Sequence, residues 1–356
     1  MTTTIAKLAV EALIANGIEQ LYCLPGVQND HFFNALFDHT DAITPIQTRH
    51  EQGAAYMATG AALATGEPQA FCVVPGPGFL NTTAALSTAY GMNAPVLALV
   101  GQIPTGAQGK GHGLLHEIPD QFGILERLTK SSHRVTGGCD AVGHVVDAFT
   151  SLVSGRPQPV GLEIAVNLWT KDVTGTLPDL APPGRPAPAV DTDAIDRAAK
   201  LITSARAPMI VVGGGAQGDS GLVRQLAART GAPVVAFRTG HGVMPSDDPL
   251  SIGMPVAHSL WNDVDLVIGL GTRLQSQVMS WGHDDDMKII HIDFRVFFPH
   301  LLKFIKIDHI GLPRISASVY IVYLKLTSAV KYSISVSVAS KVMVDKEYGN
   351  TSSKNT

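Results

Sequence analysis

The chain has 356 residues, of which 45% are hydrophobic and 16% charged, and its formal net charge is −4. This length predicts two or three domains, and this composition predicts folded globular protein. A weakly acidic chain without a basic start or a long apolar run is expected to bind neither nucleic acid nor a membrane. Its three cysteines form no CxxC pair, which favours buried thiols in a cytoplasmic protein over disulfides or a zinc site.

The first half of the chain alternates short apolar runs with helical patterns. The runs predicted as strands are Gln20–Leu24, Ala42–Gln47, Ala70–Val74, Pro95–Val100 and Val160–Ile164. Helical patterns lie between several of them, as at 29–38 and 52–65. Strands that alternate with helices form a parallel sheet covered on both faces. We therefore expect a three-layer α/β domain over residues 1–175.

A second domain is expected after a proline-rich segment. Residues 176–190 predict a stiff, extended linker because proline continues neither a helix nor a central strand. A helix is expected from Asp191. The buried runs that follow are Met209–Val212, Pro233–Phe237, Asp265–Gly269 and Lys288–Asp293. They predict a second parallel-sheet α/β domain, Rossmann-like in type, over residues 191–293.

The composition changes at Phe294. Residues 1–293 contain 33 of the 35 glycines, whereas residues 294–356 contain 2 glycines, 7 lysines and 9 serines. The alternation of helix and strand patterns also stops there. We expect residues 294–356 to be an atypical tail, unrelated to the two preceding domains. The alternative is that they form an unusual edge of the second domain.

Two turns of the first domain are candidate ligand contacts because each follows a predicted strand. Ligands of open α/β sheets bind at the carboxyl ends of strands, although glycine and proline also simply make tight turns. The turns are Pro25-Gly26 and Gly76-Pro77-Gly78. A third candidate is Glu51, which opens a helix of small residues. Thr48-x-x-Glu51 fits a capping box, so this acid either caps the helix or takes part in chemistry.

In the second domain, the segment Gly213-Gly214-Gly215 follows a predicted strand and opens a helix. Such glycines let main-chain N–H groups approach a phosphate at the positive end of a helix. A nicotinamide dinucleotide site also needs an acid about 20 residues further on. Phe237-Arg238 occupies that place, which argues against NAD.

The order of these motifs resembles the pyrimidine-binding domain of thiamine diphosphate-dependent enzymes. The resemblance is carried by Pro25-Gly26, then RHEQGAAYMA from Arg49, VVPGPGFLNTTAAL from Val73 and NAPVLALVGQIP from Asn93. Within the family it is greatest to the acetolactate synthase, benzoylformate decarboxylase and pyruvate oxidase group, and it runs from about residue 3 to 293. It implies a carboligase or decarboxylase of small-molecule 2-keto acids that binds thiamine diphosphate and forms a homo-oligomer.

The resemblance assigns roles to residues of the first domain. Glu51 would hydrogen-bond the N1′ nitrogen of the cofactor's aminopyrimidine. The turns beside the cofactor would be formed by Pro25, Gly26, Gly76, Pro77, Gly78 and Asn81. His116 would lie near the substrate as a polar contact or proton donor, although a lone histidine on a loop is more often a surface residue. Val27 stands where decarboxylases of this group carry serine or aspartate, which favours carboligation.

The second domain resembles the one that holds FAD in acetolactate synthases. The implied FAD contacts are Gly213, Gly214, Gly215, Thr239, Gly253, Met254, Gly271, Arg273 and Asp293. Pro255 follows Met254 where relatives have histidine and glycine, and many relatives keep this domain without flavin. FAD is therefore expected only as an option.

One family motif has no counterpart here. Relatives carry Gly-Asp-Gly and later asparagines that hold Mg2+ and the diphosphate. The resemblance stops at Asp293 without them, so we expect no metal ligands and a truncated, inactive or weakly active form. The alternatives are a non-catalytic partner subunit of a full-length relative and a flavin or nicotinamide oxidoreductase.

Overall fold

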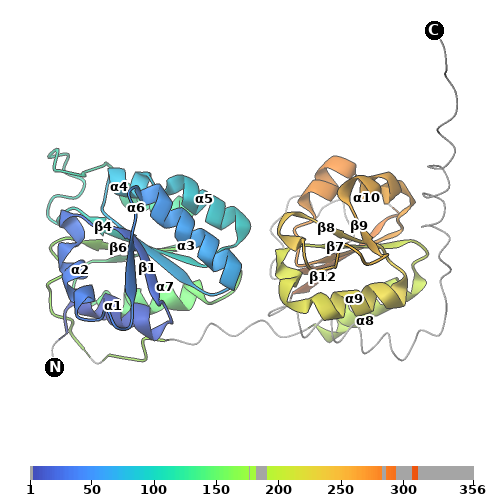
Figure 1. Cartoon of the computed structure of the whole chain (residues 1–356), viewed down its shortest axis with the longest axis horizontal. Coiled ribbons are helices and arrows are strands. Elements are labelled where there is room, and N and C mark those ends of the chain that lie inside the picture. The colour runs from blue at the N-terminus through green and yellow to red at the C-terminus, as the bar shows by residue number, and fades with distance from the viewer. Residues whose placement is uncertain (1–2, 176, 182–190, 283–285, 294–306, 312–356) are drawn as a thin grey trace, which may run out of the picture. The chain divides into compact units, whose positions relative to one another are not determined.

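The computed structural model describes residues 3–175, 177–181, 191–282, 286–293 and 307–311. The chain divides into two compact units, residues 1–186 and 187–356 (Figure 1). The boundary between them lies inside the proline-rich segment, of which residues 177–181 are described. Each unit contains one parallel sheet.

The first sheet has six parallel strands in the order β2-β1-β3-β4-β6-β5. The strands are β1 Gln20–Leu24, β2 Thr44–Gln47, β3 Gln69–Val73, β4 Val96–Gln102, β5 Ser131–Val135 and β6 Val160–Ala165. Five of them confirm the apolar runs seen in the sequence. The sixth, β5, was not predicted, because its Ser-Ser-His-Arg start is polar and an edge strand needs no continuous apolar run.

Helices cover both faces of this sheet. One face carries α1 Ile5–Ala15, α2 Asp30–Phe37 and α7 Ala141–Leu152, and the other carries α3 Glu51–Thr65, α5 Thr83–Met92 and α6 Gln121–Leu128. The short helices η1 Val27–Asn29 and α4 Pro77–Leu80 follow β1 and β3. The three-layer prediction is confirmed for this unit.

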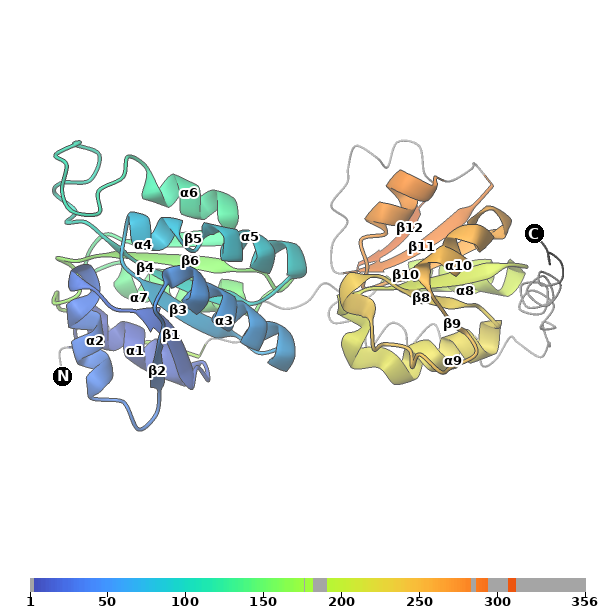
Figure 2. The same ribbon diagram turned by 45° about the horizontal axis from the view of Figure 1, so that its top comes forward.

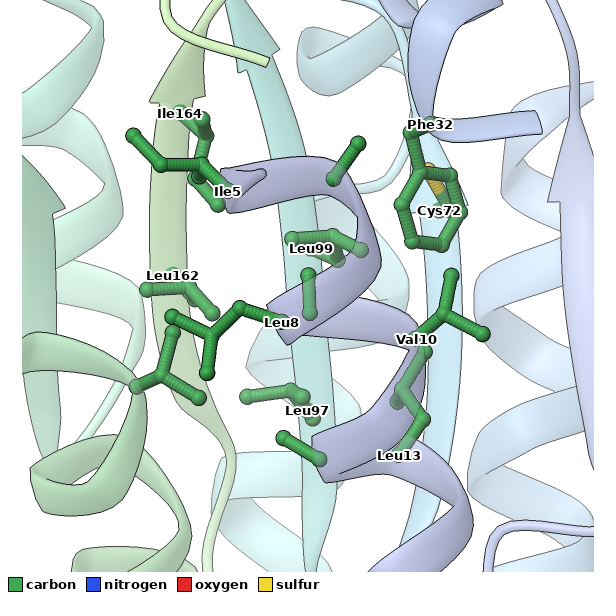
Figure 3. Packing of buried hydrophobic residues seen from close by; sticks show 14 of the residues in the cluster. Ile5, Leu8, Val10, Leu13, Phe32, Cys72, Leu97, Leu99, Leu162 and Ile164 are labelled. Carbon is green, nitrogen blue, oxygen red and sulfur yellow. The ribbon is translucent and has the colours of Figure 1, made fainter. Parts of the chain in front are cut away.

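Successive residues of the central strands point into different cores. In β4, Leu97 and Leu99 pack on the α1 side, whereas Ala98 and Val100 pack on the α3 side. Figure 3 shows Leu8 of α1 between these leucines and their neighbours on β6. This strand is buried on both faces, so polar groups that must meet solvent or ligand are confined to its ends.

The second sheet also has six parallel strands, in the order β12-β11-β10-β7-β8-β9. They are β7 Pro208–Val212, β8 Val234–Ala236, β9 Ser251–Ile252, β10 Leu266–Leu270, β11 Lys288–Asp293 and β12 Ile307–Gly311. Helices α8 Thr192–Ser204 and α9 Ser220–Thr230 cover one face (Figure 2). The other face is covered by α10 Met254–Leu260, η4 Trp261–Asp263 and η5 Gln277–Trp281. The second α/β domain is thereby confirmed, and the predicted helix start at Asp191 agrees with its place as the N-cap of α8.

The segment after residue 293 does not lie wholly apart from this sheet. Residues 307–311 form β12, which pairs in parallel with β11 from Ile289↔Ile307 to Asp293↔Gly311. The sequence analysis missed this strand because Asp308 and His309 interrupt the apolar run that marks an internal strand. A strand at an edge has one neighbour and tolerates such residues.

Among the described residues, every helix is too short or too polar to traverse a lipid bilayer.

The thiols differ in their surroundings. Cys23 and Cys72 are opposite each other on β1 and β3 and are buried, whereas Cys139 is exposed. Burial raises the pKa of Cys23 to about 11, and burial together with the neighbouring Cys23 raises the pKa of Cys72 well above its usual value. Both therefore stay protonated and unreactive at neutral pH.

We accordingly expect one thiol per chain to react rapidly with Ellman's reagent near pH 8, and three after unfolding in guanidinium. The rapid reaction should disappear in Cys139→Ser. More than one rapid thiol in the native chain would contradict the burial of the β1–β3 pair.

Candidate functional site

The first sheet has a topological switch point between β1 and β3. From β1 the chain goes to β2 on one side and returns to β3 on the other. The connections after β1 and β3 therefore diverge, and the crevice between them is the usual ligand site of such sheets. The turns Pro25-Gly26 and Pro75-Gly76 are these two connections.

Glu51 is the first residue of α3 and is half-buried beside this crevice. Its Oε2 accepts a hydrogen bond of 2.9 Å from Nδ2 of Asn81. Within the described part of the chain, Oε1 accepts no hydrogen bond. The amino end of a 15-residue helix also favours a negative charge here. The site thus offers a carboxylate with one oxygen fixed and the other available to a ligand.

The capping-box interpretation of Glu51 is wrong. The N-cap of α3 is His50, whose Nδ1 accepts the N–H of Gln52 at 3.2 Å. Thr48, the predicted cap, instead donates its hydroxyl to the carbonyls of Cys23 and His50. Because the imidazole satisfies the helix end, the Glu51 carboxylate is left to bond Asn81 rather than the main chain.

One side chain fills the space between the two turns. A Cβ at Gly26 would lie 2.7 Å from Cγ1 of Val74, and a Cβ at Gly78 would lie 2.6 Å from Cγ2 of the same valine. The Gly78 position is also 3.5 Å from Oε1 of Glu51. The two predicted turns are therefore packed together through Val74, directly beside the acid.

Gly76 has a conformation that other residues rarely adopt, with φ of 58° and ψ of −120°. It is buried, and a Cβ there would lie 2.3 Å from the carbonyl oxygen of His116. The structure thus brings the main chain of His116 against the turn, although 40 residues separate them in sequence.

His116 itself has a left-handed φ of 70°. Its Nδ1 is buried and has no hydrogen-bond partner among the described residues. The adjacent Glu117 carboxylate accepts the N–H groups of Leu114 and Gly111, and these main-chain donors lower the pKa of Glu117. The loop is therefore anchored by Glu117, and a non-glycine residue held in this region is common at functional sites.

Sequence analysis missed the polar residues behind the turn. Gln28 and Asn29 follow the first turn, are buried, and each keep one side-chain oxygen without a partner in the described chain. Gln121 and Glu163 are also buried and lie in a hydrogen-bond network that reaches Gly76. Glu163 carried a signal, because a carboxylate inside the apolar run Val160–Ile164 requires buried partners.

In the second unit, the predicted FAD contacts all lie at the carboxyl edge of the sheet. They follow β7, β8, β9 and β10, in that order, except Asp293, which is the last residue of β11. The residues are Gly213, Gly214, Gly215, Thr239, Gly253, Met254, Gly271, Arg273 and Asp293. Of these, Gly253 is the N-cap and Met254 the first residue of α10.

The glycines after β7 already contact neighbouring main chain. The N–H of Gly213 donates to Leu270 and the N–H of Gly215 donates to Gly271, both at 3.0 Å. A Cβ at Gly213 would lie 2.3 Å from the Gly271 oxygen, and one at Gly214 would lie 2.5 Å from Oγ1 of Thr239. These glycines pack the turn closely against its neighbours, and the two N–H groups are not available to a phosphate in this arrangement.

Metal ligands are not grouped in the part of the chain that the structure describes. No set of three histidine, cysteine, aspartate or glutamate residues there could hold a metal ion.

Two family comparisons match the two units separately. Residues 3–124 match the thiamine pyrophosphate enzyme N-terminal TPP binding domain, and residues 195–296 match the thiamine pyrophosphate enzyme central domain. The chain belongs to the thiamine pyrophosphate enzymes. The matches include Glu51 and both turns in the first unit, and the glycine-rich turn in the second.

Curated thiamine pyrophosphate enzymes are similar along most of the chain. A probable 2-ketoarginine decarboxylase of Pseudomonas aeruginosa is 31% identical over 76% of this chain and 49% of its own length. Acetolactate synthase of Arthrospira platensis is 32% identical over 80% of this chain and 52% of its own. The large subunit of acetolactate synthase isozyme 1 of Escherichia coli is 31% identical over 81% and 52%. The chain spans about half the length of these relatives.

The residues at the β1–β3 crevice fit the aminopyrimidine end of the cofactor that defines these thiamine pyrophosphate enzymes. The open oxygen of Glu51 can share a proton with a ring nitrogen in a hydrogen bond. Gly26 and Gly78 leave main chain and Val74, instead of further side chains, beside it. The described residues do not supply a metal and diphosphate site, so the fit concerns this end of the cofactor.

The turn at Gly76 provides a stability test with a matched control. Gly76→Ala should destabilise the first unit by about 2 kcal/mol or more, since the methyl group meets the His116 carbonyl and the left-handed φ is strained. Gly60→Ala, in the interior of α3 with no atom near its Cβ, should stabilise it by about 0.5–1 kcal/mol.

Thermal unfolding followed by circular dichroism would measure both variants. Equal effects of the two substitutions would contradict the close approach of His116 to the turn.

Proposed function

We propose that the first unit binds the aminopyrimidine of thiamine diphosphate and that Oε1 of Glu51 shares a proton with its N1′ nitrogen in a hydrogen bond. The observation that carries this proposal is the arrangement of the carboxylate. Oε2 is held by Asn81, which leaves Oε1 beside the Gly78 turn at the switch point. A carboxyl group fixed at a helix start can hold a proton at Oε1, while the remainder of the aminopyrimidine ring would pack against Val74.

The reaction class follows from the family and from this residue. When bound, thiamine diphosphate supplies a carbon nucleophile and an electron sink for the decarboxylation of 2-keto acids. Glu51 would control the protonation of the aminopyrimidine. We infer that the chain belongs to a 2-keto acid carboligase or decarboxylase, in line with relatives named acetolactate synthase and 2-ketoarginine decarboxylase.

The first turn favours carboligation over simple decarboxylation. Val27 follows Gly26 and its side chain is 68% exposed. A hydrocarbon there can neither give nor take a proton, so capture of the carbanion by a second carbonyl compound is favoured over its protonation. His116, with its unpartnered Nδ1, is our candidate for a polar contact with the substrate.

The remaining parts of the site are proposed to come from outside the described residues. Mg2+ and the diphosphate need hard oxygen ligands, and the described part of the chain groups none for them. They would be supplied by a longer relative that pairs with this chain, because a second copy of the chain also has no Gly-Asp-Gly motif. FAD in the second unit stays an option.

Ligand-observed NMR would test the cofactor site directly. Saturation transferred from the full chain to thiamine diphosphate, in the presence of Mg2+, should be greatest at the pyrimidine methyl and ring protons. Glu51→Gln should reduce that saturation at least about fivefold without unfolding the chain, since it removes a charged acceptor and costs the helix only about 0.3–1 kcal/mol.

Glu67→Gln is the matched control, because Glu67 is an exposed glutamate just beyond the end of α3. It should leave the saturation unchanged. Absence of pyrimidine saturation in the unmodified chain, or equal saturation in Glu51→Gln, would refute the proposed role. Binding without turnover of pyruvate would favour the non-catalytic partner over a self-sufficient enzyme.

A further inference from the structure

The turn that carries Asn81 is held from behind by a side chain. The buried N–H of Gly76 donates a hydrogen bond of 2.8 Å to Oε1 of Gln121, the first residue of α6. Gly76 is the N-cap of α4, and Asn81 directly follows α4. The position of Gln121 therefore bears on where Asn81 meets Glu51.

Gln121 uses both ends of its amide. Its Nε2 donates to the carbonyl of Gly101 at 2.9 Å and to Oε2 of Glu163 at 2.8 Å, and the residue is 1% exposed. A reversed amide would set N–H groups against the N–H of Gly76 and the oxygen against two acceptors. The network thus fixes one orientation, with the amide oxygen toward the turn.

The carboxylate behind this amide is itself fully bonded. Oε2 of Glu163 also accepts the amide N–H of Gln102 at 3.1 Å, and Oε1 pairs with Nε of Arg134 at 2.6 Å. The guanidinium of Arg134 lies 4.3 Å from the centre of the Phe122 ring. A buried charge held in this way strengthens the bond from Gln121, because hydrogen bonds to ionised groups are stronger and polarise their neighbours.

The segment that carries Gln121 contacts the turn at two places. Gln121 bonds the Gly76 N–H, and the main chain of His116, five residues earlier, packs where a Cβ of Gly76 would be. Between them, Asp120 caps α6 by accepting the N–H of Gly123. The turn is thus held by one rigid segment rather than by independent loops.

We propose that Gln121, anchored by Glu163, is a positioning residue that fixes the Gly76–Asn81 turn and thereby the Glu51 carboxylate. The inference rests on the proposed role of Glu51. Gln121 bonds Gly76, at the start of the turn, and Asn81, at its end, bonds Glu51. Gln121 itself is expected to touch neither cofactor nor substrate. Its effect is to set the geometry in which Asn81 holds Oε2. Without such a role, the chain would bury the side chains of Gln102, Gln121 and Glu163 for packing alone.

Amide hydrogen exchange of the full chain without cofactor tests whether Gln121 fixes the Gly76–Asn81 turn. Gln121→Leu removes all three bonds of the amide, and Gln121→Glu replaces the donor by a second carboxylate beside Glu163. At about pH 8, exchange of residues 74–82, corrected for intrinsic rates, should speed up about tenfold or more in both variants.

A pH series separates positioning from mere packing. Two adjacent carboxyl groups share a proton as the pH falls, so the new glutamic acid regains a donor toward Glu163. Protection of residues 74–82 in Gln121→Glu should therefore return toward the unmodified level near pH 5, measured against the unmodified chain at each pH. Gln121→Leu should show no return. Should Gln121→Leu fail to fold, the two ends of the Gln121→Glu series provide the same comparison.

Gln158→Leu is the matched control. Gln158 is also a buried glutamine, 8% exposed, but its amide donates to the Tyr90 carbonyl and not to the turn. Exchange of residues 74–82 in this variant should stay within about twofold of the unmodified chain. Unchanged exchange of that segment in both Gln121 variants would overturn the proposal.

The saturation-transfer experiment with thiamine diphosphate tests whether the position of the turn affects cofactor binding. Gln121→Leu should lower the saturation of the pyrimidine protons of thiamine diphosphate at least about threefold, and Gln121→Glu should lower it at pH 8 but less near pH 5. A loosened turn with full saturation would overturn the positioning role while leaving Glu51 in place. No saturation in the unmodified chain would refute the proposed function, and the exchange data would still decide whether Gln121 fixes the turn.

Discussion

Both sheets are wholly parallel, and this constraint sets the positions of the other features described above. After every strand the chain must cross back over a face of the sheet, so both faces become covered by helices and the strands become apolar. Polar groups and strained residues are therefore found at the strand ends and in the connections between strands. At the end of β1 and β3 these connections diverge, which is why Glu51, Asn81 and the two turns meet at that point.

The fold was largely predictable because it is written in short-range patterns. Internal strands are continuous apolar runs bounded by glycine or proline, and nine of the twelve strands were predicted from that signal. The three that were missed, β5, β9 and β12, lie at sheet edges, where one-sided pairing tolerates polar or very short strands. Asp191 was recognisable as a helix start because aspartate is a favoured N-cap residue, and its side chain does accept the N–H of Ala194.

The site was predictable in its residues but not in its bonds. Gly26, Gly76, Gly78 and Glu51 could be selected by motif, whereas the identity of the helix cap could not. A histidine N-cap is rare enough that Thr48 was preferred on general grounds. The Gln121–Glu163 network joins α6 to β6, and such long-range side-chain pairing leaves no periodicity in the sequence. The lone acid within an apolar strand was its only visible trace.

Val74 restricts which amino-acid substitutions this region can tolerate during evolution. Its two methyl groups occupy the space that a side chain on Gly26 or Gly78 would need. A larger residue at either glycine is compatible only with a smaller one at position 74, and shrinking Val74 alone opens a void beside the acid. Substitutions at these three positions are therefore coupled, because each tolerated change depends on the residues at the other two. Among relatives, the three positions should change together.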